Sequence, residues 1–217
     1  MSYVISFLSG KGGITKTTLA RAISVKFTKD EWKVGGLDID TAQASFHYWN
    51  TLRENNGITP TFDVMNGTPN DLPRLVAESR YHLIVVDGAA YGSMDSQKVA
   101  EQSDMIVVGC RFSIDDMKSA VETMNGLVRK GIPIDRFCVV FSGVPEQRTL
   151  TNYNNAAAYM AKTPYFVANG FIEQMNSITN AQNVGYAMNE VQYPSVREKI
   201  DVVLNNIVAR MEQITAG

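Results

Sequence analysis

Ten residues near the start of the chain have the composition of a phosphate-binding loop. Glycines allow a tight turn that aims backbone N–H groups at phosphate oxygens, and the following helix N-terminus adds partial positive charge. Lys16 would reach the β- and γ-phosphates of a nucleotide, and the Thr17 hydroxyl would ligate Mg2+. The alternative is a glycine-rich turn that only joins a strand to a helix. The segment consists of Ser9, Gly10, Lys11, Gly12, Gly13, Ile14, Thr15, Lys16, Thr17 and Thr18.

Carboxylates follow two later apolar stretches of the sequence. Asp38 and Asp40 end one stretch, and Asp87, followed by Gly88, ends the other. An apolar strand that ends in Asp matches the Walker B pattern, so Asp87 is predicted to hold Mg2+ through water. For Asp38 and Asp40, an open alternative is that they cap the next helix.

Apolar β-branched stretches alternate with helical patterns along the whole chain. Strands without polar alternation are typical of a parallel sheet buried on both faces. The order predicts an α/β fold of the P-loop NTPase type, a doubly wound, mostly parallel sheet with helices on both faces, in a single domain over residues 1–217. The predicted strands are 4–8, 34–37, 83–86, 105–108 and 137–141, and the predicted helices are 17–27, 115–130 and 195–214.

Residues 11–17 resemble the deviant Walker A motif, K-G-G-x-x-K-[ST], of the ParA/MinD superfamily. The resemblance covers nearly the whole chain and implies ATP and Mg2+ as ligands, with slow, partner-stimulated ATP hydrolysis. Within it, Lys11 is the signature lysine that crosses a dimer interface to the partner's nucleotide. Asp40 helps to position or activate the attacking water, and Asp38 supports the Mg2+ network. The resemblance thus implies catalytic roles for Lys11, Lys16 and Asp40, and metal roles for Thr17, Asp38 and Asp87.

Several positions depart from the pattern of that family. Thr15 stands where the family has glycine, and a β-branched residue tolerates unusual backbone angles poorly. Nucleotide binding is expected to survive, because the Thr15 N–H remains available to phosphate. Ser142 begins a segment that lacks the family's adenine-contacting Asn and Arg. Ser113 and Asp116 match a family loop at the dimer face, and they equally match an N-terminal helix cap.

The resemblance extends to small plasmid-partition ParA proteins, including those similar to ParF. It implies an ATP-dependent homodimer that binds DNA non-specifically and positions plasmid or protein cargo. A centromere-binding, ParB-like adaptor would stimulate hydrolysis, and the protein would be cytoplasmic and nucleoid-associated. Basic residues that could contact DNA phosphates are Arg129, Lys130, Arg136, Lys162, Arg197, Lys199 and Arg210.

Other functions use the same motifs. A MinD-like membrane-associated ATPase would need a basic amphipathic tail, and residues 211–217 contain no Lys or Arg. An iron–sulfur reductase would need paired cysteines at a dimer axis. A metabolic P-loop kinase or ligase stays open, and its turnover would respond to a small substrate.

The composition is that of an ordinary globular protein. The net charge of −2 provides no overall attraction to nucleic acid. Cys110 and Cys138 lie in apolar stretches and are expected to be buried thiols. We find no signal peptide and no apolar run of the roughly 20 residues that a membrane span needs, so a membrane partner is not expected.

Overall fold

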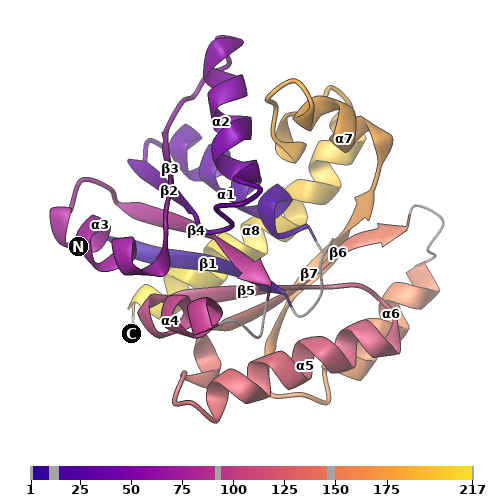
Figure 1. Ribbon diagram of the computed structural model, residues 1–217. Coiled ribbons are helices and arrows are strands. Elements are labelled where there is room, and N and C mark those ends of the chain that lie inside the picture. Colours follow the sequence, from indigo (N-terminus) through magenta and orange to yellow (C-terminus); the bar gives the residue numbers. More distant parts are fainter. Residues whose placement is uncertain (1, 10–14, 91–93, 146–149, 217) are drawn as a thin grey trace.

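The computed structural model describes residues 2–9, 15–90, 94–145 and 150–216. Its centre is a seven-stranded sheet in the order β3-β2-β4-β1-β5-β6-β7 (Figure 1). Every neighbouring pair of strands is parallel, as the sequence predicted. The strands are β1 (Tyr3–Ser9), β2 (Val34–Asp38), β3 (Asp63–Asn66), β4 (Leu83–Ala90), β5 (Met105–Cys110), β6 (Phe137–Pro145) and β7 (Phe166–Gln174).

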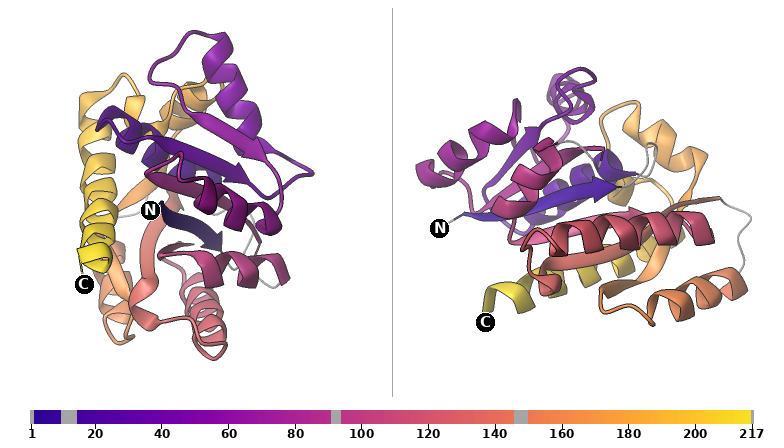
Figure 2. Two further views of the ribbon diagram at one scale, coloured as in Figure 1. Left: turned by 90° about the vertical axis from the view of Figure 1, so that its left-hand side faces the viewer. Right: turned by 60° about the horizontal axis from the view of Figure 1, so that its bottom comes forward.

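Helices cover both faces of this sheet (Figure 2). Four of them, α1 (Lys16–Lys29), α2 (Ser45–Asn55), α7 (Asn176–Gln182) and α8 (Pro194–Ala216), pack with η3 (Met188–Glu190) on one face. The opposite face is covered by α3 (Leu72–Glu78), α4 (Met94–Gln102), α5 (Ile114–Val128) and α6 (Leu150–Met160). Two further 3-10 turns are η1 (Pro69–Asp71) and η2 (Ile134–Arg136).

The central strands are buried on both faces, which explains their largely apolar sequences. Along β1, Ile5 and Phe7 point into the core beneath α1 and α8, whereas Val4 and Leu8 point into the opposite layer. Successive side chains of a strand alternate between faces, so a strand covered on both sides needs mostly apolar residues, and Ser6, a buried polar side chain inside β1, accepts a hydrogen bond from the Ser103 hydroxyl at 2.9 Å. This packing fixes where the strands end, and therefore where the residues that follow them lie.

The cysteines lie in opposite layers, Cys138 beneath α8 and Cys110 beneath α5. Both are buried thiols outside any disulfide, as expected from their apolar surroundings. Burial raises the pKa of the Cys138 thiol to about 12, against a smaller opposing effect of Arg210. A thiol with this pKa stays protonated near neutral pH and is a poor nucleophile.

A buried ion pair ties the end of α2 to η3. The Arg53 side chain is fully buried and donates to both carboxylate oxygens of Glu190, at 2.6 and 3.0 Å. Burial alone would raise the pKa of Glu190, but the hydrogen bonds from Arg53 and from the Ala187 N–H leave it below its usual value. Lys29 adds a third contact to the same carboxylate, at 3.1 Å.

We predict that Glu190→Gln destabilises the protein by about 3 kcal/mol, because Arg53 is left as a buried charge without its counter-charge. Glu173→Gln is the matched control, since Glu173 pairs with Lys199, which is 67% exposed, and its loss should cost less than about 1 kcal/mol. Urea unfolding of the three proteins measures both differences. Equal free-energy losses in the two variants would contradict the assignment.

Candidate functional site

The candidate site lies at the carboxyl edge of the sheet, where β1, β2 and β4 end. A cavity of about 320 Å³ opens there between the start of α1 and the loop after β2. The predicted site residues Gly10, Lys11, Gly12, Gly13 and Ile14 lie outside the described residues. The residues that line the cavity are Thr15, Lys16, Thr17, Thr18, Asp38, Asp40, Gln43, Ser45, Asp87 and Gly88.

Thr15 occupies a backbone conformation that favours glycine. Its φ of 26° and ψ of 25° are positive, and it precedes the first residue of α1. Its carbonyl accepts the first helical hydrogen bond, from the Leu19 N–H at 2.9 Å, but its side chain does not cap the helix. The Thr15 hydroxyl instead donates to the Ser142 hydroxyl on β6. Where the family has glycine, the threonine of this chain therefore adds a hydroxyl that ties the start of α1 to strand β6.

Lys16, Thr17 and Asp87 converge on one point of the cavity. The Lys16 ammonium donates to the Ser9 hydroxyl at 3.2 Å, and the Thr17 hydroxyl donates to the Asp87 carboxylate. Asp87 is 3% exposed, and its Oδ1 atom is buried with no hydrogen-bond partner among the described residues. Burial raises the pKa of Asp87 to about 7, Asp38 adds to this effect, and Thr17, Lys16 and Arg21 oppose it.

These residues fit a bound Mg2+ ion. An orphaned carboxylate oxygen and a neighbouring hydroxyl are hard oxygen donors, and nucleotide-bound Mg2+ uses few protein ligands besides phosphate oxygens and water. Among the residues described, no group of three or more His, Cys, Asp or Glu side chains is placed to hold a metal by itself. A cation beside Asp87 would also remove the cost of keeping this carboxylate ionised while buried.

Asp38 holds the start of α2. One of its oxygens accepts from the N–H groups of Phe46 and His47, at 2.8 and 3.2 Å, and the other accepts from the Asp40 N–H at 3.2 Å. The capping interpretation of Asp38 therefore has its hydrogen bonds in the structure. Because both oxygens are engaged, Asp38 would act on a cation through its charge while it fixes the loop that follows.

Asp40 sits on the rim of the cavity and is half-buried. Its carboxylate accepts from the Gln43 N–H at 3.3 Å, so it shapes its own turn and is still open to the cavity. Gly88, on the opposite wall, is needed for packing, because a Cβ there would lie 2.6 Å from the Phe7 carbonyl oxygen. Asp40, which follows the end of β2, and Gly88, which lies in β4, therefore line the same cavity.

Two residues of the site could not be found from motifs. The sequence marks Ser142 only by the family residues that it replaces, and no motif includes Arg21. Arg21 lies one helical turn after Thr17, and the negative charges of Asp87 and Asp38 both act to raise its pKa. Arg21 follows Thr17 by four residues, which places the two on the same side of a helix. This spacing could have indicated that Arg21 lies near the site, but it is equally typical of an exposed arginine on a helix.

Outside the cavity, the remaining polar candidates have structural contacts. Ser113 caps α5, accepting from the Asp116 N–H at 3.1 Å, which confirms the capping interpretation of that pair. His47 contacts the Val64 carbonyl through Nδ1 at 2.7 Å, and His82 Nδ1 accepts from the Lys33 N–H at 3.1 Å. These contacts account for both histidines without a chemical role.

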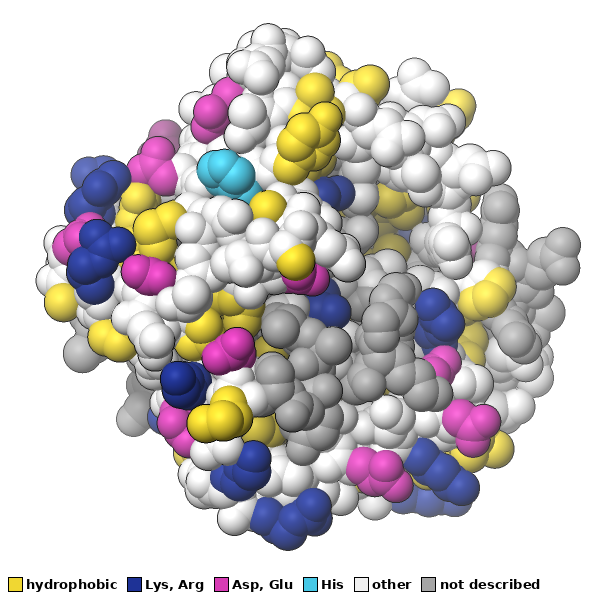
Figure 3. Space-filling view, in the orientation of Figure 1, with side chains coloured by type: hydrophobic (Ala, Val, Ile, Leu, Met, Phe, Trp, Pro, Cys, Tyr) yellow, Lys and Arg dark blue, Asp and Glu magenta, His cyan; other side chains and the backbone are white. Residues whose placement is uncertain are grey.

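The surface offers no obvious basic patch on the face shown in Figure 3, where Lys and Arg side chains are mixed with Asp and Glu. Of the basic residues considered for DNA contact, Arg136, Arg197 and Arg210 donate to backbone carbonyls of the same chain. These three arginines hold the fold together at least in part, so their presence in the sequence is not evidence of a DNA surface.

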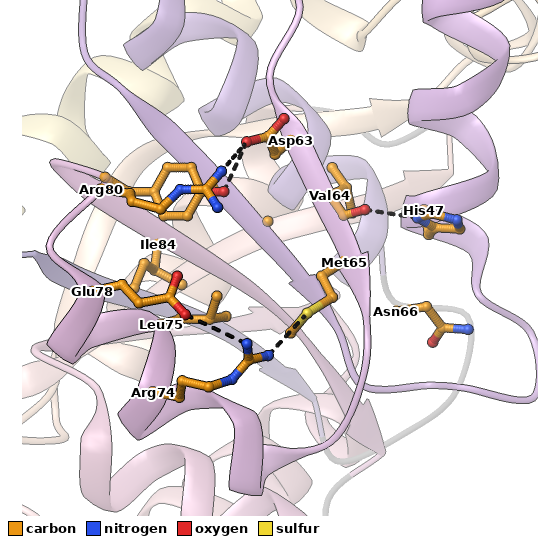
Figure 4. Close-up of a pocket in the computed structure, with 13 residues that line it drawn as sticks. His47, Asp63, Val64, Met65, Asn66, Arg74, Leu75, Glu78, Arg80 and Ile84 are labelled. Carbon is orange, nitrogen blue, oxygen red and sulfur yellow. Dashed lines mark hydrogen bonds and ion pairs between the residues drawn. The ribbon is translucent and has the colours of Figure 1, made fainter.

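A larger cavity, of about 550 Å³, lies between edge strand β3 and α3 (Figure 4). Its charged side chains pair with one another, Arg74 with Glu78 at 3.4 Å and Arg80 with Asp63 at 3.1 Å. A binding site would present polar groups that converge on a ligand, whereas these groups already satisfy each other. We therefore place the function at the smaller cavity beside Lys16.

We predict that the raised pKa of Asp87 makes the nucleotide-free and Mg2+-free protein lose stability as pH rises. The contribution is fully present below the unfolded pKa of 3.8 and is lost as pH rises through about 7. Asp87→Asn stays neutral at every pH. In thermal unfolding without divalent cations, its Tm should be closest to the wild-type Tm at pH 3.5, and its advantage over wild type should grow as pH rises to 8.5. A difference that does not change with pH would refute the raised pKa.

We also predict that Thr15 and Ser142 are energetically coupled. Thr15→Val and Ser142→Ala each remove one hydroxyl of the pair, so the double variant should be about 1 kcal/mol more stable than the sum of the single effects implies. Thr123→Val removes a hydroxyl that bonds only within α5, and its effect should add to that of Ser142→Ala. Chemical unfolding measures both cycles, and additivity at Thr15 would exclude a stabilising contact.

Comparison with known proteins identifies the family of the chain. The family model of the CobQ/CobB/MinD/ParA nucleotide binding domain matches residues 5–186. None of the curated proteins matched the sequence. Across the described residues, no helix combines the length and hydropathy that crossing a bilayer requires.

Solved structures share the fold at low sequence identity. MinD from Aquifex aeolicus has a TM-score of 0.73 and 16% identity, over 96% of this chain and 98% of that chain. MinD from Pyrococcus horikoshii, complexed with Mg-ADP, has a TM-score of 0.74 and 16% identity, over 95% and 96%. A protein described as a plasmid partition protein from Borrelia burgdorferi, bound to AMPPNP, has a TM-score of 0.71 and 17% identity, over 97% and 100%. With the family model matching most of its length, the chain belongs to the CobQ/CobB/MinD/ParA nucleotide-binding family.

Proposed function

We propose that the protein is a ParA-type ATPase that binds ATP with Mg2+, dimerises around the nucleotide and hydrolyses ATP slowly. The observation that carries this proposal is the convergence of Lys16, Thr17 and the buried, half-unpartnered carboxylate of Asp87 at the carboxyl edge of the sheet. Ligands of open parallel sheets bind at this edge. Family membership and the Mg-ADP in the similar MinD structure support the same ligands.

Each residue has a distinct part in this proposal. Lys16 neutralises charge on the β- and γ-phosphates, and Thr17 with Asp87 holds the Mg2+, which supplies further charge neutralisation when bound. Asp40, on the rim, orients the attacking water and takes its proton. Lys11, which lies outside the described residues, would complete the phosphate site of a second copy. Asp38 supports Mg2+ through its charge and keeps the Asp40 loop in place.

The proposed dimer would use the face that surrounds the phosphate loop. Met94, Ile114 and Leu150 are the first residues of α4, α5 and α6, and they are 80%, 57% and 68% exposed. Those helices follow β4, β5 and β6, so three large exposed apolar side chains lie towards the same carboxyl edge of the sheet as the nucleotide cavity. Exposed apolar residues gathered on one face are typical of interaction surfaces.

The biological role we propose is the positioning of a plasmid or another cargo. The ATP-bound dimer would bind DNA non-specifically, and a centromere-binding, ParB-like adaptor would stimulate hydrolysis. Support comes from the family and from the described plasmid partition protein, whose whole chain aligns with 97% of this one. Similar structures also include MinD and McdA proteins, so the proposal covers the positioning activity and does not name the cargo.

The first experiment is light scattering with Mg2+ and ADP, or Mg2+ and ATP. We predict a mass near 24.0 kDa with ADP and twice that value with ATP. Lys11→Ala should stay monomeric with ATP because the lysine that reaches across to the partner is lost. Ile114→Asp should weaken the dimer through a buried charge. The matched control Val202→Asp, which replaces an exposed valine on α8, should not.

Further measurements separate the candidate roles. A DNA-binding assay with ATP should show retention that falls steeply with salt, since phosphate contacts release counterions. A monomer in every nucleotide state, with ATP bound tightly, would contradict the ParA-type dimer and favour a metabolic P-loop kinase or ligase. ATP-dependent binding to anionic vesicles without DNA binding would favour a MinD-like role.

A further inference from the structure

Arg21 connects the phosphate-binding helix to two other helices. Its Nη2 atom donates to the Ser45 carbonyl at 2.7 Å, and its Nη1 atom donates to the Gln182 side chain at 3.0 Å. Ser45 is the first residue of α2 and Gln182 is the last residue of α7. The Arg21 side chain therefore links α1, the helix that follows the phosphate loop, to Ser45, where the loop over residues 40–45 ends.

The surroundings of Arg21 hold its guanidinium in one place. The group lies over the ring of Trp49, 5.2 Å from the ring centroid, and Arg53 lies 5.6 Å from the same ring. Trp49 is only 2% exposed, so the ring is a fixed platform. Burial lowers the pKa of Arg21 to about 10, while Asp87 and Asp38 act in the opposite direction. Arg21 is therefore charged near neutral pH.

The loop over residues 40–45 depends on anchors at its two ends. At its start, Asp38 accepts from the Asp40 N–H, and at its end Asp38 accepts from the first N–H groups of α2. Inside the loop, Ala44 has a φ of 45°, which is unfavourable for a residue with a Cβ. A strained turn persists only where its surroundings hold it. The hydrogen bond from Arg21 to the Ser45 carbonyl ties the end of this loop to α1.

We propose that Arg21 is a positioning residue, which holds the 40–45 loop, and with it Asp40, at a fixed place against the phosphate-binding helix. The planar guanidinium can bond Ser45 and Gln182 at once while it stacks on Trp49, and a lysine ammonium cannot. This inference deepens the proposed function, because the role of Asp40 in hydrolysis rests on that proposal. Arg21 itself does not touch the reacting atoms.

The direct test is hydrogen exchange of residues 40–45 in the nucleotide-free protein, for wild type, Arg21→Lys and Gln182→Ala. We expect at least roughly fivefold faster exchange in this loop for Arg21→Lys, because opening becomes easier when an anchor is lost. Gln182→Ala removes the contacts of Arg21 and Thr18 with α7 but keeps the bond from Arg21 to Ser45, so it should leave the loop unchanged. Arg21→Gln, which also removes the charge, serves as the second variant if Arg21→Lys does not fold. Unchanged exchange in a folded Arg21 variant would overturn the proposal.

Kinetics then tests the link to Asp40. We expect Arg21→Lys to lower the rate of ATP hydrolysis by roughly ten- to hundredfold, since small displacements of a catalytic group have large effects. Its affinity for a fluorescent ATP analogue should stay within about twofold of wild type, because the phosphate loop is untouched. Equal losses of rate and affinity would mean a general structural defect and would overturn the positioning role. If the wild-type protein binds no ATP, the proposed function is refuted instead. The hydrogen-exchange result would still show whether Arg21 holds the loop over residues 40–45.

Discussion

The site is organised by two carboxylates that are buried close together at one edge of the sheet. Asp38 is fully buried and Asp87 is nearly so, and the charge of Asp38 adds to the cost of ionising Asp87. Lys16 and Arg21, both on α1, are the cations that offset this charge. The parallel strands deliver their terminal residues to this single edge, and the packing of α1 beneath them brings the positive charges to the same place. A cation and a phosphate chain are the ligands that complete such a charge arrangement.

The same region joins the helices on one face of the sheet. Arg21 on α1 and Arg53 on α2 both lie over the ring of Trp49, so one aromatic ring contacts guanidinium groups from both helices. Arg53 continues the chain of contacts to Glu190 in η3, and Arg21 continues it to α7. Movements of the loop after β2 would therefore be transmitted to α7 and η3 through polar contacts, and not only through apolar packing.

The sequence predicted the strands that are buried on both faces, because short, unbroken apolar runs between turn residues are typical of such strands. It did not predict β3 or β7. β3 has only four residues at the sheet edge, and β7 is interrupted by Asn169 and Gly170, the latter with a φ of 84°. Lys16, Thr17, Asp38, Asp40 and Asp87, which the motifs singled out, line one cavity, and their roles there stay predictions. Ser142 and Arg21 escaped prediction because their roles depend on contacts 127 and 24 residues away along the chain.

The short outer strand has a consequence for how copies of the protein can associate. β3 forms one border of the sheet and has only four residues, and the carbonyl of one of them, Val64, contacts the His47 side chain. So short an edge strand offers few main-chain groups to another β-strand, which lowers the tendency towards uncontrolled edge-to-edge polymerisation at this border. Association on this side of the molecule is then directed to surfaces built from side chains. A small ligand can reverse contacts of that kind, whereas continuous main-chain pairing between molecules would be hard to undo.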